Sequence, residues 1–173
     1  MINLLEHVLS EDWENGGFGF YIHWPFCAAK CPYCDFNSHV RNNIDQKQWL
    51  RSYLSEINRV SKNTSNRSLN SVFFGGGTPS LIEPWVINDI LNKIKKYWKT
   101  RDIFEITLEA NPGSVDAKNF KAYRSAGVNR VSMGIQSLNE KDLKALGRTH
   151  TVKEALSAFE IARQNFPDVS FDL

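Results

Sequence analysis

Residues 71–80, with the sequence SVFFGGGTPS, join a short apolar run to three consecutive glycines. The β-branched and aromatic residues of this run predict a buried strand, and the glycines permit a sharp exit from it. Pro84 suits the first turn of a helix. The apolar residues that follow it recur at helical spacing, at Ile87, Ile90, Leu91, Ile94 and Trp98. The stretch therefore predicts one strand–loop–helix unit.

The same unit recurs on both sides of this stretch. Further strands are predicted at residues 18–24, 103–109, 129–136 and 169–173. Further helices are predicted from Asp45, over residues 116–126 before Gly127, and after the capping-box pairs Ser137/Glu140 and Thr151/Glu154. Regular alternation of strands and helices predicts an α/β fold with a parallel sheet. With helices on one outer face, such a sheet forms part of a TIM-like (β/α) barrel.

The chain divides into a polar lead-in, residues 1–17, and one domain, residues 18–173. The lead-in ends in Asn15-Gly16-Gly17, which favours a turn before the first strand. The last residue falls within about the fifth predicted strand, where an ordinary domain does not end. We therefore expect an N-terminal fragment of a longer chain, with the barrel truncated at that strand.

Composition bounds the possible functions. The 173 residues include 21 Lys and Arg against 19 Asp and Glu, so a net charge of +2 gives no broad field for nucleic acid. A basic cluster between Lys93 and Arg101 falls at a predicted helix C-terminus, where cations complement the helix dipole. No apolar run approaches the roughly 20 residues of a membrane-spanning helix. The first residues of the chain also lack the basic and then apolar order of a signal peptide. A cytoplasmic location is expected.

Cys27, Cys31 and Cys34 form a C-x3-C-x2-C loop directly after the first predicted strand. Their odd number and local spacing favour metal binding over disulfides. A [4Fe-4S] cube normally takes four thiolates, so three leave one iron open to a small molecule. A structural Cys3His zinc site, with His23 or His39 as the fourth ligand, and three unrelated buried thiols are the alternatives.

Several motifs resemble the radical SAM (S-adenosylmethionine) enzymes of the oxygen-independent coproporphyrinogen oxidase family, with the nearer likeness to its HemW-type heme chaperone branch. The motifs are YIHWPFC at 21–27, DFNS at 35–38, FFGGGTPS at 73–80, EANPG at 109–113, VNRVSMGIQS at 128–137 and LGRTH at 146–150. The resemblance implies that the three cysteines hold a [4Fe-4S] cluster whose open iron chelates SAM. It also implies reductive cleavage of SAM to a 5'-deoxyadenosyl radical.

The expected SAM contacts lie at strand ends and in the loops after them. The resemblance assigns Tyr21, Gly76, Gly77, Thr78, Glu109 and Gln136 to SAM. Glu109 and Gln136 both close predicted strands, so in a barrel they share the rim that carries the cysteine loop. The fork of Arg148 suits the SAM carboxylate, and Asp172 suits ribose hydroxyls. The glycine at position 76 is expected to let the backbone approach SAM closely. Gly76→Val should therefore weaken SAM binding and spare the cluster.

The branch of the family decides the expected function. The dehydrogenase branch typically carries a cysteine two positions after the third cluster cysteine, where this chain has Phe36. The resemblance to the chaperone branch implies heme as cargo, delivered to apoproteins such as membrane-bound respiratory enzymes, and an electron donor. The heme ligand is expected outside these residues, and no catalytic side chain is assigned. A coproporphyrinogen III dehydrogenase and a zinc-stabilised structural domain are the alternatives.

Overall fold

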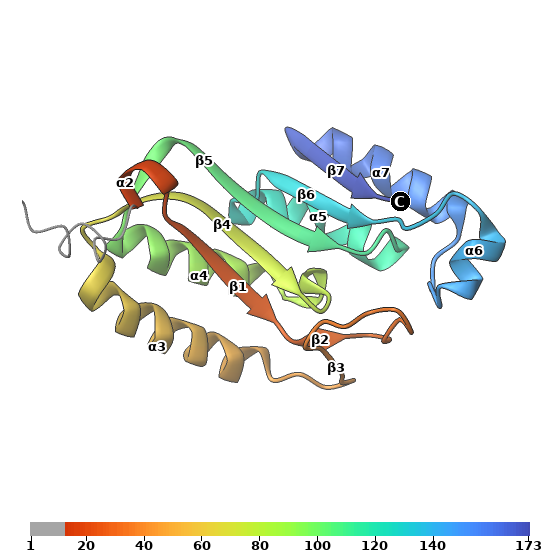
Figure 1. Cartoon of the computed structure of the whole chain (residues 1–173), viewed down its shortest axis with the longest axis horizontal. Helices are drawn as coiled ribbons and strands as arrows, with labels where there is room; N and C mark the ends of the chain where they lie inside the picture. The colour runs from red at the N-terminus through yellow and green to blue at the C-terminus, as the bar shows by residue number, and fades with distance from the viewer. Residues whose placement is uncertain (1–12) are drawn as a thin grey trace, which may run out of the picture.

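Five parallel strands form the central sheet, in the order β1-β4-β5-β6-β7 (Figure 1). The structure, a computed structural model, describes residues 13–173, apart from the side chains of residues 114–116. The strands are β1 (Gly19–Trp24), β4 (Ser68–Gly76), β5 (Lys99–Ala110), β6 (Arg130–Gly134) and β7 (Asp168–Asp172). Each strand pairs with the next long strand of the chain, so the predicted parallel α/β sheet is confirmed.

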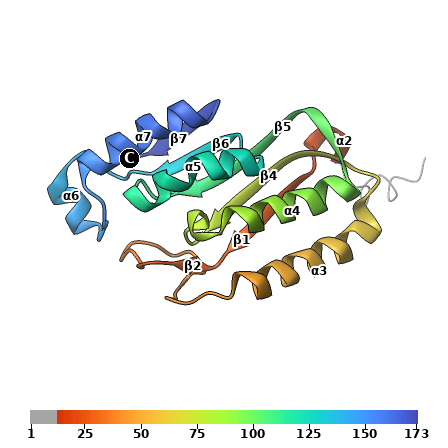
Figure 2. The ribbon, with the colours of Figure 1, turned by 180° about the vertical axis from the view of Figure 1, so that it is seen from behind.

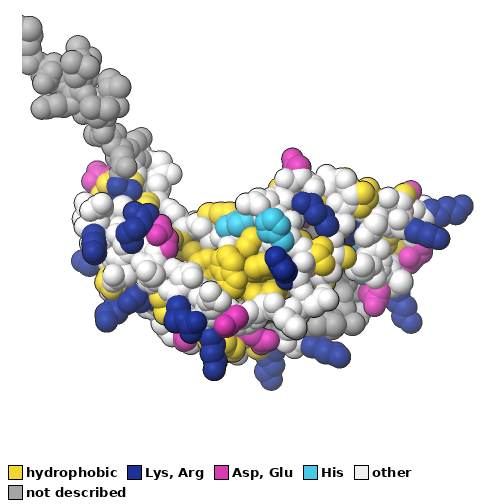
Figure 3. All heavy atoms as spheres, turned by 90° about the horizontal axis from the view of Figure 1, so that it is seen from below, with side chains coloured by type: hydrophobic (Ala, Val, Ile, Leu, Met, Phe, Trp, Pro, Cys, Tyr) yellow, Lys and Arg dark blue, Asp and Glu magenta, His cyan; other side chains and the backbone are white. Residues whose placement is uncertain are grey.

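Helices cover one face of this sheet (Figures 1 and 2). They are α3 (Gln46–Thr64), α4 (Pro84–Tyr97), α5 (Ser114–Ala126) and α7 (Val152–Asn165). The shorter elements are α2 (Trp13–Gly16), the 3-10 turn η1 (Pro79–Leu81) and α6 (Glu140–Ala145). None of the four long helices covers the opposite face, which we call the open face. Seen from below in Figure 3, histidine side chains lie beside hydrophobic ones in the middle of the molecule.

The core lies between the sheet and the four long helices. Side chains alternate along each strand, so every second residue points to the helices. The inward residues of the central strands are Val72, Phe74, Ile106, Leu108, Val131 and Met133, all buried. They pack with the buried stripe of α4, which is Val86, Ile87, Ile90, Leu91 and Ile94. Each such side chain contributes about 1.5–3 kcal/mol relative to an exposed one.

The helix starts show which capping predictions hold. Thr151 and Glu154 form the predicted capping box at the start of α7. The box predicted for Ser137 and Glu140 is wrong, because Asn139 is the N-cap of α6 and its side chain accepts from the Lys141 N–H at 2.8 Å. The Ser137 hydroxyl instead accepts from the Asn139 N–H at 3.1 Å, one residue earlier than the Glu140 N–H that a capping box requires.

The predicted element boundaries differ from the structure at the polar ends. Strand β4 begins at Ser68 rather than at residue 71, and β5 begins at Lys99 rather than at 103. Their first residues pair with each other, Ser68 opposite Lys99, because backbone pairing there needs no apolar side chains. Helix α3 likewise continues into a polar stretch and ends at Thr64. Most of the predicted lead-in, residues 1–12, lies outside the described residues.

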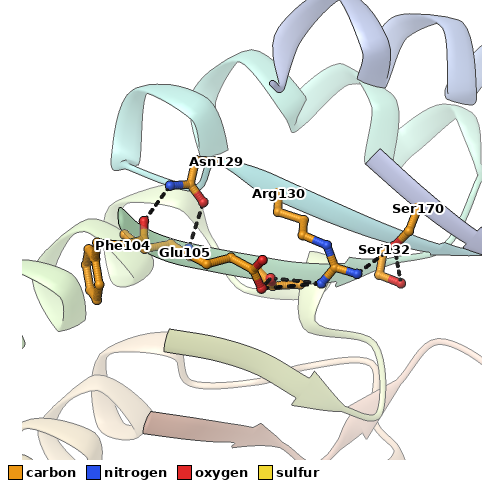
Figure 4. Close-up of polar contacts among 8 residues, drawn as sticks. Phe104, Glu105, Asn129, Arg130, Ser132 and Ser170 are labelled. Atoms are coloured by element: carbon orange, nitrogen blue, oxygen red, sulfur yellow. Dashed lines mark hydrogen bonds and ion pairs between the residues drawn. The ribbon is translucent and has the colours of Figure 1, made fainter. Parts of the chain in front are cut away.

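A row of polar side chains crosses the open face and joins three strands (Figure 4). Arg130 on β6 donates through Nη1 to Thr107 Oγ1 on β5 at 3.1 Å, and through Nη2 to Ser170 Oγ on β7 at 2.9 Å. Glu105 lies 3.5 Å from Nη1, and Ser170 donates on to Ser132 at 3.2 Å. The guanidinium therefore holds β5, β6 and β7 in register on the face that no long helix covers.

Asn129 holds the start of β6 against β5 (Figure 4). Its Oδ1 accepts from the Ile106 N–H and its Nδ2 donates to the Phe104 carbonyl, both at 2.7 Å. We expect Asn129→Ala to lower the free energy of unfolding by about 2–4 kcal/mol, because two partly buried backbone groups lose their partners. Thermal or urea denaturation followed by circular dichroism measures the change. Asn92→Ala, at an exposed position of α4, should stay within about 0.5 kcal/mol of the parent.

Candidate functional site

A cavity of about 320 Å³ opens at the carboxyl ends of the strands, the end at which α/β barrels place their chemistry. The loop between β1 and α3 forms one wall, and the ends of β4, β5, β6 and β7 form the others. All of the predicted site residues except Tyr21 line it: Cys27, Cys31, Cys34, Gly76, Gly77, Thr78, Glu109, Gln136, Arg148 and Asp172. Residues from six separate segments of the chain thus meet at one place.

The cysteine loop is closed at its base by a short pairing that the sequence did not predict. Strands β2 (Phe26–Cys27) and β3 (His39–Val40) pair in parallel, and the His39 N–H donates to the Pro25 carbonyl at 2.8 Å. Two-residue strands carry no periodic signal, so only the folded chain reveals them. Cys27 is the last residue of β2, and Cys31 and Cys34 lie on the loop that the pairing encloses.

Within the loop, Lys30 connects the two sides. Its ammonium donates to the carbonyls of Phe36 and Ser38, each at 3.3 Å. The Cys34 N–H donates to the Cys31 carbonyl at 3.1 Å, which forms a tight turn between the second and third cysteines. Cys27 is buried, while Cys31 and Cys34 are half-buried beside the cavity.

The glycines at the end of β4 lie too close to neighbouring atoms of the protein to carry a side chain. Gly76 has φ +113°, and a Cβ there would lie 2.6 Å from His23 Nδ1. A Cβ on Gly77 would lie 2.5 Å from the Phe26 carbonyl oxygen. Both positions therefore exclude side chains because of contacts inside the protein. A side chain at Gly76 would also meet the Trp24 carbonyl oxygen, at 2.9 Å, so the expectation that a valine there weakens SAM binding and spares the cluster stays a prediction.

We expect Gly77→Ala to destabilise the protein by about 1–3 kcal/mol, because the new methyl group would overlap the Phe26 backbone. Thermal melting of the purified variant measures the loss. Gly16→Ala is the matched control, since a Cβ at Gly16 meets nothing within 4 Å. Equal melting temperatures for Gly77→Ala and Gly16→Ala would show that the backbone has room at position 77.

Two acids and an amide form the polar side of the cavity. Gln136 donates through Nε2 to the Asp172 carboxylate at 2.6 Å, and its N–H donates to the Asp172 carbonyl at 2.8 Å. Gln136 has φ +71°, an uncommon conformation for a residue other than glycine. The Glu109 carboxylate accepts from the Gly76 N–H at 3.1 Å. Burial raises the pKa of Glu109, and the nearby Asp172 charge raises this pKa further.

Arg148 enters the cavity from the segment between α6 and α7. Its Nη2 donates to Asn111 Oδ1 at 2.9 Å and to the Gly134 carbonyl at 2.7 Å. Its Nη1 lies 3.3 Å from the sulfur of Cys31 and 3.4 Å from the Tyr33 hydroxyl. Asn111 and Tyr33 were not among the predicted site residues. The available signal was their place inside the quoted EANPG motif and the cysteine loop.

Tyr21 is the predicted site residue that the structure leaves outside the cavity lining. It lies on β1 and is 58% exposed, with its ring stacked on Phe73 at a centroid distance of 5.9 Å. Partial burial raises its pKa, with a second contribution from the charge of Glu109. His23, a candidate fourth ligand of the zinc alternative, places Nε2 3.0 Å from the Asn37 carbonyl oxygen.

The donor set fits an iron–sulfur cluster. The three thiols are distributed along one loop and line one cavity, so each can bind a different iron. Among the described side chains, which leave out residues 1–12 and 114–116, no three of His, Cys, Asp or Glu converge on the position of a single metal ion. The described helices also include none that is long and apolar enough to cross a membrane.

Comparison with known proteins identifies the family. The family model of the radical SAM superfamily matches residues 21–173. The chain belongs to the radical SAM superfamily. Heme chaperone HemW of Haemophilus influenzae is 47% identical over 148 residues, which cover 83% of this chain and 39% of that protein. The mitochondrial radical S-adenosyl methionine domain-containing protein 1 of Bos taurus is 40% identical, with 88% of this chain and 35% of that protein covered.

Solved radical SAM structures confirm the partial barrel. The structure of coproporphyrinogen III oxidase HemN from Escherichia coli, titled a radical SAM enzyme, matches with a TM-score of 0.81 and 25% identity. The match covers 90% of this chain and 36% of the HemN chain. The chain spans about two fifths of the length of the curated relatives it matches. The predicted likeness to the HemW-type branch of the superfamily is confirmed by relatives that carry that name.

Proposed function

We propose that this radical SAM protein binds a [4Fe-4S] cluster through Cys27, Cys31 and Cys34 and binds SAM in the adjoining cavity. The observation that carries the proposal is the shared cavity: the three thiols and the predicted SAM groups line one space at the carboxyl ends of the strands. The family gives cluster and SAM use in general. A mononuclear zinc site remains the alternative, and membership of this superfamily weighs against it.

The residues around the cavity suit the polar groups of SAM. The Arg148 guanidinium would pair with the SAM carboxylate, and the Glu109 carboxylate would accept from its ammonium. The Asp172 carboxylate, held by Gln136, would accept from ribose hydroxyls. The backbone of Gly76, Gly77 and the buried Thr78 would bound the space beside the cluster. The chemistry supplied by a bound cluster is one-electron reduction of the sulfonium, for which these residues bind, orient and exclude water.

Tyr21 stays part of the proposal at the edge of the site. Its ring lies on the open face beside Phe73, and the Glu109 charge acts on its hydroxyl. From this position the ring would contact a ligand that extends from the cavity onto the open face. Tyr21 on β1 and Glu109 on β5 would then both border the ligand.

The whole protein is proposed to act as a cytoplasmic heme chaperone. The relatives named heme chaperone HemW support heme as cargo, and Phe36 stands where the dehydrogenase branch typically has a cysteine. The cargo would pass to apoproteins such as membrane-bound respiratory enzymes, and an electron donor would reduce the cluster. The second candidate, an oxygen-independent coproporphyrinogen III dehydrogenase, is favoured by the structural likeness to HemN.

We expect anaerobic reconstitution with iron and sulfide to give one [4Fe-4S] cluster per chain, and Cys27→Ala, Cys31→Ala or Cys34→Ala to abolish it, because each thiolate binds a different iron. Iron and sulfide analysis with absorbance near 400 nm, about the range of Fe–S charge transfer, measures the content. Exposure to air should bleach the protein. A colourless parent that binds one zinc would instead support the structural zinc site, and full iron content in any alanine variant would refute the ligand assignment.

Heme handling separates the two candidate functions. In the native full-length protein we expect saturable uptake of heme and its transfer to an apoprotein, with no oxidation of coproporphyrinogen III in the presence of SAM and reductant. Absorbance titration with heme and chromatography of the porphyrin products measure the two activities. Formation of protoporphyrinogen, without stoichiometric heme uptake, would favour the dehydrogenase.

A further inference from the structure

Arg148 stands out because its guanidinium contacts a cysteine that is proposed to bind iron. The residue follows Gly147 in the segment between α6 and α7, far in sequence from the cysteine loop. Its Nη1 lies 3.3 Å from Cys31 Sγ and 3.4 Å from the Tyr33 hydroxyl. Its Nε is buried without a hydrogen-bond partner among the described residues. The guanidinium is thus a half-buried cation beside a thiol.

The other half of the guanidinium is fixed by the sheet. Nη2 donates to the Gly134 carbonyl at the end of β6, at 2.7 Å, and to Asn111 Oδ1 just after β5, at 2.9 Å. Asn111 in turn places Nδ2 3.4 Å from Thr78 Oγ1. Because the fork is planar and rigid, two anchors on Nη2 determine where Nη1 points. The anchors aim Nη1 at the sulfur of Cys31.

We propose that Arg148 is a positioning residue for Cys31, and that its N–H···S bond raises the reduction potential of the bound cluster. The inference rests on the proposed function, because it requires Cys31 to bind iron. Reduction adds one electron to the cluster, so negative charge on the sulfur ligands increases. A charged donor aimed at one sulfur stabilises the reduced state more than the oxidised state. Hydrogen bonds to cluster sulfurs are a recognised determinant of potential.

Lys30 provides a control for the effect of positive charge alone on the reduction potential. Lys30 is a second cation that lines the same cavity, and it lies on the cysteine loop itself. Its ammonium donates to the carbonyls of Phe36 and Ser38, not to a cysteine sulfur. Lys30→Gln therefore removes a positive charge near the cluster without removing an N–H···S bond. Arg148→Lys does the reverse, since it keeps the charge and loses the fork.

The experiment compares midpoint potentials of anaerobically reconstituted parent, Arg148→Lys, Arg148→Gln, Asn111→Ala and Lys30→Gln. Each protein is titrated without SAM, with dithionite as the one-electron reductant, and the reduced cluster is followed by electron paramagnetic resonance. We expect both Arg148 variants to have a roughly tenfold lower reduced-to-oxidised ratio at a fixed solution potential, a negative shift of about 59 mV for one electron. Asn111→Ala should shift in the same direction by less, because one anchor of Nη2 remains.

The outcomes separate this inference from the proposed function. Absence of a [4Fe-4S] cluster in the parent would refute the proposed function itself. If the parent holds a cluster, two results would refute the proposed effect of the N–H···S bond on the potential. One is a midpoint potential of Arg148→Lys equal to that of the parent. The other is a shift for Lys30→Gln as large as that for Arg148→Gln. If an Arg148 variant assembles no cluster, the Asn111→Ala potential decides: a negative shift supports the bond, and an unchanged potential and spectrum refute it.

Discussion

The cavity depends on one close backbone contact, between the end of β4 and the segment that leads into the cysteines. The Gly77 N–H donates to the Trp24 carbonyl at 2.7 Å, and the Thr78 N–H donates to the Phe26 carbonyl at 2.8 Å. These bonds bring two backbones so close that neither Gly76 nor Gly77 has room for a side chain. Because Cys27 follows Phe26 directly, the first thiol is fixed relative to the sheet, and the loop after it is held beside the strand ends.

The polar groups of the cavity form hydrogen-bonded pairs, and the two members of each pair come from different elements. Glu109 accepts from the backbone of Gly76, and Gln136 donates to Asp172. A site held in this way is already shaped for a ligand, so binding needs little ordering of side chains. The raised pKa of Glu109 reflects its burial first and the charge of Asp172 second. A cationic ligand group beside Glu109 would favour the ionised form of its carboxyl group.

The sequence was informative wherever the signal was local. Strand and helix order followed from hydrophobic periodicity, and the position of the cysteines directly after the first predicted strand placed their loop correctly beside the strand ends. What failed depended on tertiary contacts. The β2–β3 pairing is too short to have a period, Asn139 rather than Ser137 is the N-cap of α6, and the close approach of His23 to Gly76 has no signal in the sequence. Period-two alternation along β1 determines which face Tyr21 points to. It does not determine how far the cavity extends along that face, so the exclusion of Tyr21 from the lining could not be predicted.

The cysteine loop and Arg148 explain why cluster binding and folding of this region should be coupled. The loop has only a two-residue strand pairing and a few hydrogen bonds of its own, which contribute about 1 kcal/mol each. Its contact with Arg148 forms only when β6 and the segment after α6 are also folded, because Gly134 and Asn111 orient the guanidinium. A ligand that binds only the folded state adds its binding free energy to that state. A cluster held by the three thiols would therefore stabilise the loop and, through Cys31 and Arg148, the ends of β5 and β6 as well.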